Sequence, residues 1–74
     1  MNLKENIRNI IEDNNLVEWF LHNNPPESYA FWNAPEMDLI YNELMTQDNN
    51  ITAMEFSVAC VELKKNLKLL AEAN

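Results

Sequence analysis

The side chains with the greatest chemical potential in this 74-residue chain are one histidine and one cysteine, His22 and Cys60. An imidazole beside a thiol could take its proton and create a nucleophile. One residue of each type is a weak signal, however, and Cys60 falls on an apolar helical stripe, where small thiols are usually buried and inert. With no glycine for a phosphate loop and no cluster of His and Cys for zinc, the sequence predicts no enzymatic activity, cofactor or metal site.

The stretch DNNITAMEF, residues 48–56, resembles the second half of a calcium-binding EF-hand loop. Asp48 and Glu55 would occupy its fifth and twelfth positions. The first and third positions would then be Leu44 and Thr46, and Asn49 stands in place of the glycine, so too few oxygen ligands remain for calcium. We interpret this stretch as a loop followed by the start of a helix.

Helix starts are marked by a recurring pair, a capping residue followed three positions later by glutamate. The cap oxygen can accept from the amide of the third helical residue, and the glutamate can reach back to the amide of the cap. Prolines in the first turn support two of these starts, because proline lacks only an amide that the helix leaves unpaired there. The pairs are Asn2 with Glu5, Asn15 with Glu18, Asn24 with Glu27, Asn33 with Glu36, and Thr52 with Glu55.

Together with apolar residues at helical spacing, these starts predict an all-α fold. We expect one domain over residues 1–74, a small bundle of four to five helices with a long C-terminal helix. Without glycine, the helices should end at asparagine in the left-handed conformation, with Asn14, Asn23 and Asn49 as candidates. The expected helices span residues 3–12, 16–22, 25–32, 35–45 and 53–73.

No apolar run is long enough to cross a membrane, and the first ten residues lack the hydrophobic core of a secretory signal. A single cysteine also excludes an intramolecular disulfide. These features predict a cytoplasmic protein, located in the host cytoplasm if the protein is viral.

The long C-terminal helix carries two apolar stripes. Its main seam alternates spacings of four and three, as in a heptad repeat, and consists of Phe56, Cys60, Leu63, Leu67 and Leu70. A second stripe lies beside it and contains Met54, Val58 and Val61. The main seam could be the core contact for the shorter helices, whereas the second stripe could bind a partner helix or a second copy of the chain.

Charge is distributed unevenly along the chain. The basic residues are Lys4, Arg8, Lys64, Lys65 and Lys68, whereas residues 9–63 contain ten acidic residues and no lysine or arginine. The field of such a segment repels phosphate backbones and attracts basic surfaces. The sequence therefore argues against direct nucleic-acid binding and favours a protein partner with a basic surface. A simpler alternative is that the acidic side chains only keep a small protein soluble.

Aromatic rings crowd the same acidic segment, where Tyr29, Phe31 and Trp32 follow Trp19 and Phe20. A core of this size can bury few large rings well, so we expect at least one ring on the surface. Exposed tyrosine and tryptophan are favoured anchors of protein interfaces. The predicted partner-binding residues are Glu27, Tyr29, Trp32, Glu36, Asp38 and Glu43.

In size, charge and composition the chain is similar to small acidic proteins with which phages and mobile elements block host nucleic-acid machinery, some by mimicking the charge of DNA. This similarity implies an inhibitor or modulator that binds a basic surface of a host protein. The alternative is a structural or adaptor protein that forms a homodimer through its long C-terminal helix, with Met54, Val58 and Val61 at the interface.

Overall fold

The computed structural model describes residues 2–22, 25 and 28–73 of the chain. Within these residues the chain forms five helices and no strand, which confirms the predicted all-α fold and its long C-terminal helix. The third helix begins at Tyr29, later than the predicted start at residue 25, and the fourth continues to Gln47. The helices are α1 (Leu3–Asp13), α2 (Val17–His22), α3 (Tyr29–Trp32), α4 (Pro35–Gln47) and α5 (Ala53–Ala73).

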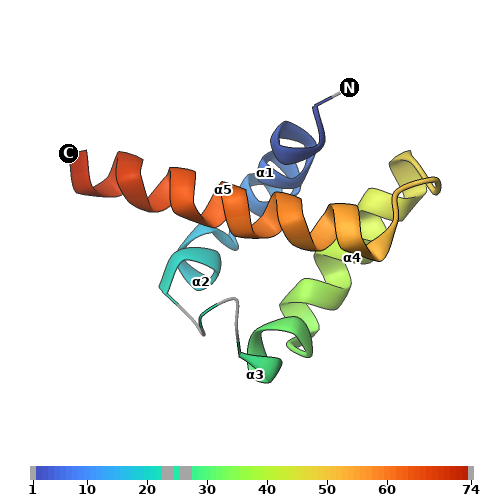
Figure 1. The fold of residues 1–74 in the computed structure, drawn as a ribbon, viewed down its shortest axis with the longest axis horizontal. Coiled ribbons are helices and arrows are strands. Elements are labelled where there is room, and N and C mark those ends of the chain that lie inside the picture. Colours follow the sequence, from blue (N-terminus) through green and yellow to red (C-terminus); the bar gives the residue numbers. More distant parts are fainter. Residues whose placement is uncertain (1, 23–24, 26–27, 74) are drawn as a thin grey trace.

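Helix α5 runs along the longest dimension of the molecule, which measures 35 × 27 × 21 Å (Figure 1). Its 21 residues correspond to a length of about 31 Å. Helix α1 crosses behind α5 and packs against α5, α4 and α2. Helix α1 is therefore in contact with three of the other four helices.

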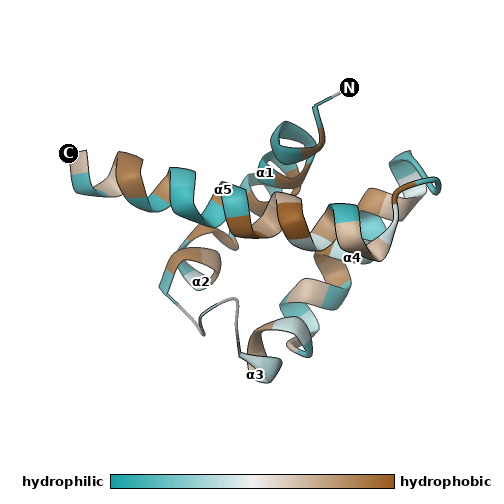
Figure 2. Cartoon of the chain, viewed as in Figure 1, coloured by the Kyte–Doolittle hydropathy of each residue, from teal (hydrophilic) through white to brown (hydrophobic). Residues whose placement is uncertain are grey.

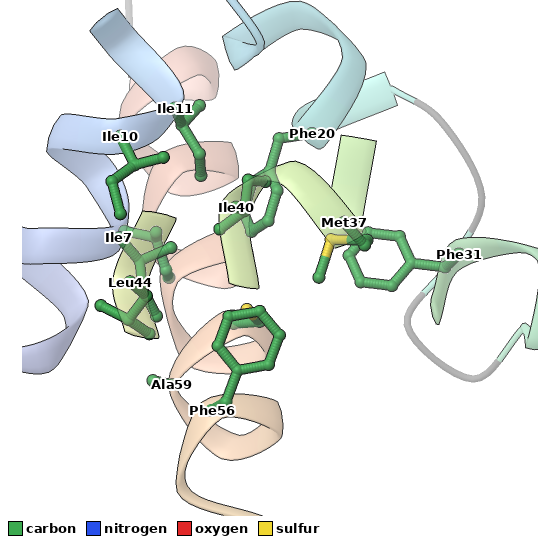
Figure 3. Packing of buried hydrophobic residues seen from close by; sticks show 12 residues of the cluster. Ile7, Ile10, Ile11, Phe20, Phe31, Met37, Ile40, Leu44, Phe56 and Ala59 are labelled. Carbon is green, nitrogen blue, oxygen red and sulfur yellow. The ribbon is translucent and has the colours of Figure 1, made fainter. Parts of the chain in front are cut away.

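All five helices contribute to one hydrophobic core (Figure 3). The isoleucines of α1 are buried in it, and α1 packs against both long helices. Because each helix buries only one stripe, the core is continuous rather than divided into separate clusters. The buried residues are Ile7, Ile10, Ile11, Phe20, Phe31, Met37, Ile40, Leu44, Phe56, Ala59, Cys60 and Leu63.

The main seam of α5 is buried only in part. Phe56, Cys60 and Leu63 belong to the core, and Leu67 packs against its edge. Leu70, the last residue of the predicted seam, is 52 % exposed. Leu70 belongs to the C-terminal turns of α5, which extend beyond the helices that cover its first half (Figure 1).

A left-handed asparagine ends α1, one residue later than expected. Asn15 has φ 58° and is the only non-glycine residue with positive φ in the described chain. Its amide donates to the carbonyl of Glu12, and the amide of Leu16 donates to that of Ile11, as in a Schellman motif. The predicted left-handed caps at Asn14 and Asn49 are therefore wrong, and Asn23 lies outside the described residues.

Two of the five predicted capping pairs form. The amide of Glu5 donates to Asn2 Oδ1 at 3.2 Å. At the start of α5 both halves of the capping box are present. The amide of Glu55 donates to Thr52 Oγ1, and the amide of Thr52 donates to Glu55 Oε1, each at 3.1 Å. The carboxylate of Glu55 thus helps to fix the start of α5.

The other pairs do not cap in this way. Asn33 ends α3 instead of starting α4, because its Nδ2 donates back to the carbonyl of Tyr29 at 2.9 Å. Helix α4 begins after Ala34 without a side-chain cap, with Pro35 in its first turn. Asn15 adopts the left-handed conformation in the turn that ends α1. The pair at residues 24 and 27 lies outside the described residues.

Replacement of the Thr52 cap of α5 should measurably lower the stability of the protein. We expect Thr52→Ala to lower the free energy of unfolding by about 1 kcal/mol, because the amide of Glu55 loses its acceptor. Urea denaturation measures this change. Thr46→Ala is a matched control in the last turn of α4, where the exposed hydroxyl donates to the carbonyl of Glu43, and it should leave stability unchanged or slightly raised. Equal losses in both variants would contradict the cap's role.

The boundary of the seam can be tested with two leucines on the same helix. Leu63→Ala should lower the free energy of unfolding by about 2 to 5 kcal/mol, because it leaves a cavity between α1 and α5. Leu70→Ala removes the same atoms from an exposed site and should cost less than about 1 kcal/mol. Thermal unfolding followed by circular dichroism compares them; an unchanged melting temperature for Leu63→Ala would place the seam outside the core.

Candidate functional site

Four of the predicted partner-binding residues, Tyr29, Trp32, Glu36 and Asp38, lie at one corner of the molecule. It is formed by α3 and the first turn of α4, and we call it the α3–α4 corner. Tyr29 begins α3 and is 82 % exposed. Asp38 is exposed and Glu36 is half-buried; the two project from different sides of α4 because they are two positions apart. Glu27 belongs to the predicted set but lies outside the described residues.

Most of the rings near this corner face inward and surround Phe31. Trp19 stacks on Phe31 with ring centroids 5.7 Å apart, and Trp32 meets it edge-on at 4.8 Å. Phe20 completes the cluster at 6.0 Å. Trp32 is therefore a half-buried support of the core, and Tyr29 is the ring that the corner exposes.

Glu43 lies two turns further along α4, where the helix faces the end of α1. Its Oε2 accepts a hydrogen bond from Asn14 Nδ2 at 3.2 Å, and the same amide nitrogen donates to the carbonyl of Ile10 at 2.8 Å. Glu43 thus links α4 to the end of α1. The structure separates it from the α3–α4 corner.

A buried lysine holds the short helices against α5. Lys64 is 5 % exposed, and its Nζ donates to the carbonyl of Phe20 at 2.6 Å. The same nitrogen lies 5.7 Å from the ring centroid of Phe20 and 5.0 Å from that of Phe31. A cation is favoured near the last carbonyls of a helix and over aromatic faces. One side chain therefore connects α5 to α2 and α3.

The burial of Lys64 is not among the features predicted from the sequence, although its spacing carries the signal. Lys64 follows Cys60 by four positions and precedes Leu67 by three, and both neighbours belong to the main seam. A lysine at such a position must either extend its stem to reach water or find partners inside. The rings and the carbonyl of α2 supply those partners.

The other basic side chains are more exposed. Lys4 pairs with Glu62 at 3.4 Å and Arg8 with Glu12 at 3.5 Å, whereas Lys65 and Lys68 lie exposed on the second half of α5. Positive charge is thus confined to α1 and to this half of α5. Among the described residues of the α3–α4 corner, every charged side chain is acidic.

The second predicted stripe of α5 lies on the surface, on the side of the helix roughly opposite the buried seam and not beside it as expected. Met54 and Val58 are 77 % and 53 % exposed, and Val61 is half-buried. Two hollows, of about 540 and 360 Å³, are both lined by Val58; Leu3 from α1 contributes to the larger one. Hydrophobic segments alternate with hydrophilic ones along α5 (Figure 2). We call Met54, Val58 and Val61 the outer stripe.

The groups with possible reactivity lie in different environments. Cys60 is fully buried, and burial raises the pKa of its thiol to about 12, so the thiolate is not available near neutral pH. His22 is exposed, with Nε2 3.3 Å from Glu18 Oε2. Among the described residues no three His, Cys, Asp or Glu side chains are grouped to hold a metal ion. None of the described helices has the length and apolarity to cross a bilayer.

No protein-family model, curated protein or solved structure matches the chain. Its candidate surfaces are therefore defined by their own geometry, the acidic α3–α4 corner with Tyr29 and the apolar outer stripe of α5.

The role of Lys64 can be tested by removing its charge while keeping its apolar stem. Lys64→Met should lower the free energy of unfolding by about 1 to 3 kcal/mol, because the carbonyl of Phe20 loses a buried donor and the rings lose the cation. Lys65→Met changes the exposed neighbour in the same way and should stay within about 0.5 kcal/mol of the parent. Denaturant unfolding compares them, and equal stabilities of both variants and the parent would overturn this role.

Proposed function

We propose that the protein is a small acidic protein-binding module that binds a basic surface of a partner protein through the α3–α4 corner. The observation that carries this proposal is the position of Tyr29. A tyrosine ring this exposed gains nothing from the core, although the four neighbouring rings pack on one another. Tyr29 lies on the helix that precedes the acidic first turn of α4, and we expect its ring to enter a pocket of a partner while the carboxylates meet basic groups around that pocket.

The charge pattern supports the choice of partner. A protein of net charge −7 is repelled by nucleic acid but steered towards surfaces that bind nucleic acid, because those surfaces are basic. The partner is therefore a nucleic-acid-handling enzyme or complex, and the module inhibits or modulates it by occupying its basic groove. A phage or mobile element acting in the host cytoplasm is the setting in which such mimicry is useful.

The residues of the corner have different roles in this proposal. Glu36 and Asp38 provide long-range attraction and so influence the rate of association. Tyr29 is the buried anchor of the complex and influences the rate of dissociation. Trp32 packs on Phe31 and holds α3 in place, so its removal would mix a loss of stability with a loss of binding. Tyr29 is the cleaner residue to test.

Affinity capture from a host lysate, at low and high salt and with competing DNA, isolates the partner for kinetic measurement. Tyr29→Ala should speed dissociation by about 30-fold, equivalent to about 2 kcal/mol, because the anchor is lost. The double variant Glu36→Lys and Asp38→Lys should instead slow association and reduce its dependence on salt. Surface plasmon resonance separates the two rates.

Asp13→Lys is the matched control for the charge change, because it reverses an exposed acidic residue at the end of α1, away from the α3–α4 corner. Asp13→Lys should slow association less than Asp38→Lys alone, which changes the charge by the same amount. Circular dichroism of each variant checks that the fold is retained. An acidic partner, or binding that is indifferent to salt and DNA, would contradict the proposed function.

A further inference from the structure

Helix α5 carries a second heptad seam on the side opposite its buried one. Spacings of four, three, four and three connect the outer stripe with two lysines beyond it, in the order Met54, Val58, Val61, Lys65 and Lys68. At about 100° per residue, this line lies roughly opposite the line through Phe56, Cys60 and Leu63. The helix therefore presents one seam to its own core and a second seam to the outside. We call this second line of five residues the outer seam.

The surface along the outer seam has apolar side chains with hollows beside them, as helix packing requires. Val58 lines both hollows described above, and Leu3 and Ala59 extend the apolar lining of the larger one. A ridge of apolar side chains flanked by hollows is the surface into which a facing helix inserts its own side chains. The described chain supplies no element that covers this ridge.

Charge indicates how a second α5 would lie on it. The first half of the outer face carries Glu55 and Glu62, and the second half carries Lys65 and Lys68. A parallel pair would place each lysine against the same lysine of the other copy, and like charges would meet. An antiparallel pair instead brings the lysine-bearing half of each helix to the acidic half of the other.

One antiparallel register satisfies the apolar residues and the charges together. When Val58 faces Val61 of the second copy, Met54 faces Lys65 of that copy, and the same two contacts repeat across the twofold axis. The stem of Lys65 can cover Met54 while its ammonium lies beside Glu55 of the facing helix. Glu62 keeps its own partner Lys4, which lessens the repulsion between the acidic residues of the two copies.

We propose that the outer stripe is a self-association surface through which two copies of the chain pair antiparallel along α5, with Val58 of one copy against Val61 of the other. The contact covers about three turns of helix and is smaller than a standard interface, so the dimer is weak. It is separate from the α3–α4 corner and does not depend on the proposed function.

Sedimentation equilibrium at protein concentrations from about 10 μM to 1 mM tests the pairing. The average mass should rise from 8.7 kDa towards twice that value. Added salt should strengthen the association, because it screens the repulsion between two copies of net charge −7 while the apolar contacts persist. Binding of a basic partner has the opposite salt dependence, so failures of the two proposals are distinguishable.

Substitutions locate the surface. Val58→Glu should weaken self-association at least tenfold, because it places an acidic group in the apolar seam. Leu39→Glu is the matched control, since Leu39 is also an exposed apolar residue but lies on α4, and it should leave the dimer unchanged. Circular dichroism checks that both variants fold. A chain that stays monomeric throughout the concentration range, or equal dimerisation of Val58→Glu and the parent, overturns the proposal.

Disulfide trapping distinguishes the orientation. A mixture of the Met54→Cys and Lys65→Cys variants should form a mixed disulfide under mild oxidation, because these positions face each other in the antiparallel pair. Met54→Cys alone should form little disulfide, since the two copies of that position lie about 16 Å apart along the helices. Cys60 is buried and does not compete. Rapid self-linking of Met54→Cys without a mixed product would show a parallel pair and overturn the register.

Discussion

The contact of Lys64 with α2 and α3 is the interaction on which the arrangement of the short helices depends. With six and four residues, these helices are too short to be stable alone. Their position is set by packing against neighbouring helices and by the ring cluster around Phe31. The ammonium of Lys64 reaches both short helices, through the carbonyl of Phe20 and the faces of two rings. The long helix therefore acts as a support for the segment that precedes α4.

This support decides which aromatic ring reaches the surface. Phe31 faces Lys64 and fixes the rotation of α3, so Trp32 is brought to the edge of the same ring. Tyr29 is two positions before Phe31, and in a helix such residues do not share a face. The exposure of Tyr29 is thus a geometric consequence of the inward position of Phe31.

Much of the fold could be predicted from the sequence, because helical periodicity and capping pairs are local signals. The box at Thr52 and Glu55 forms as predicted, in a loop that gives its residues no competing role. The asparagines at short connections were harder to assign. Asn33 and Asn15 each follow one helix and precede the next, so the same side chain could start a helix or end one, and both end one. Tertiary geometry, which no local pattern contains, decides between these roles.

The candidate surfaces were predictable to different degrees. Exposure of a ring near the prolines followed from the limited capacity of a small core, and the outer stripe was recognisable from its helical spacing. The inward position of Trp32 and the link from Glu43 to Asn14 did not, because each depends on which helix lies opposite. Burial of Lys64 was signalled by its spacing, but its partners Phe20 and Phe31 belong to a segment more than thirty residues away in the chain.

The apolar residues of the outer stripe are not required by the fold. The buried seam already supplies the contacts of α5 with the core, so polar residues at the outer positions would leave that core intact. Apolar residues there instead expose a continuous surface, which promotes association in a small protein. Lys65 and Lys68 interrupt the stripe after two turns and limit its extent. A short apolar stripe bounded by lysines restricts association to a facing helix of matching pattern, and α5 itself carries that pattern.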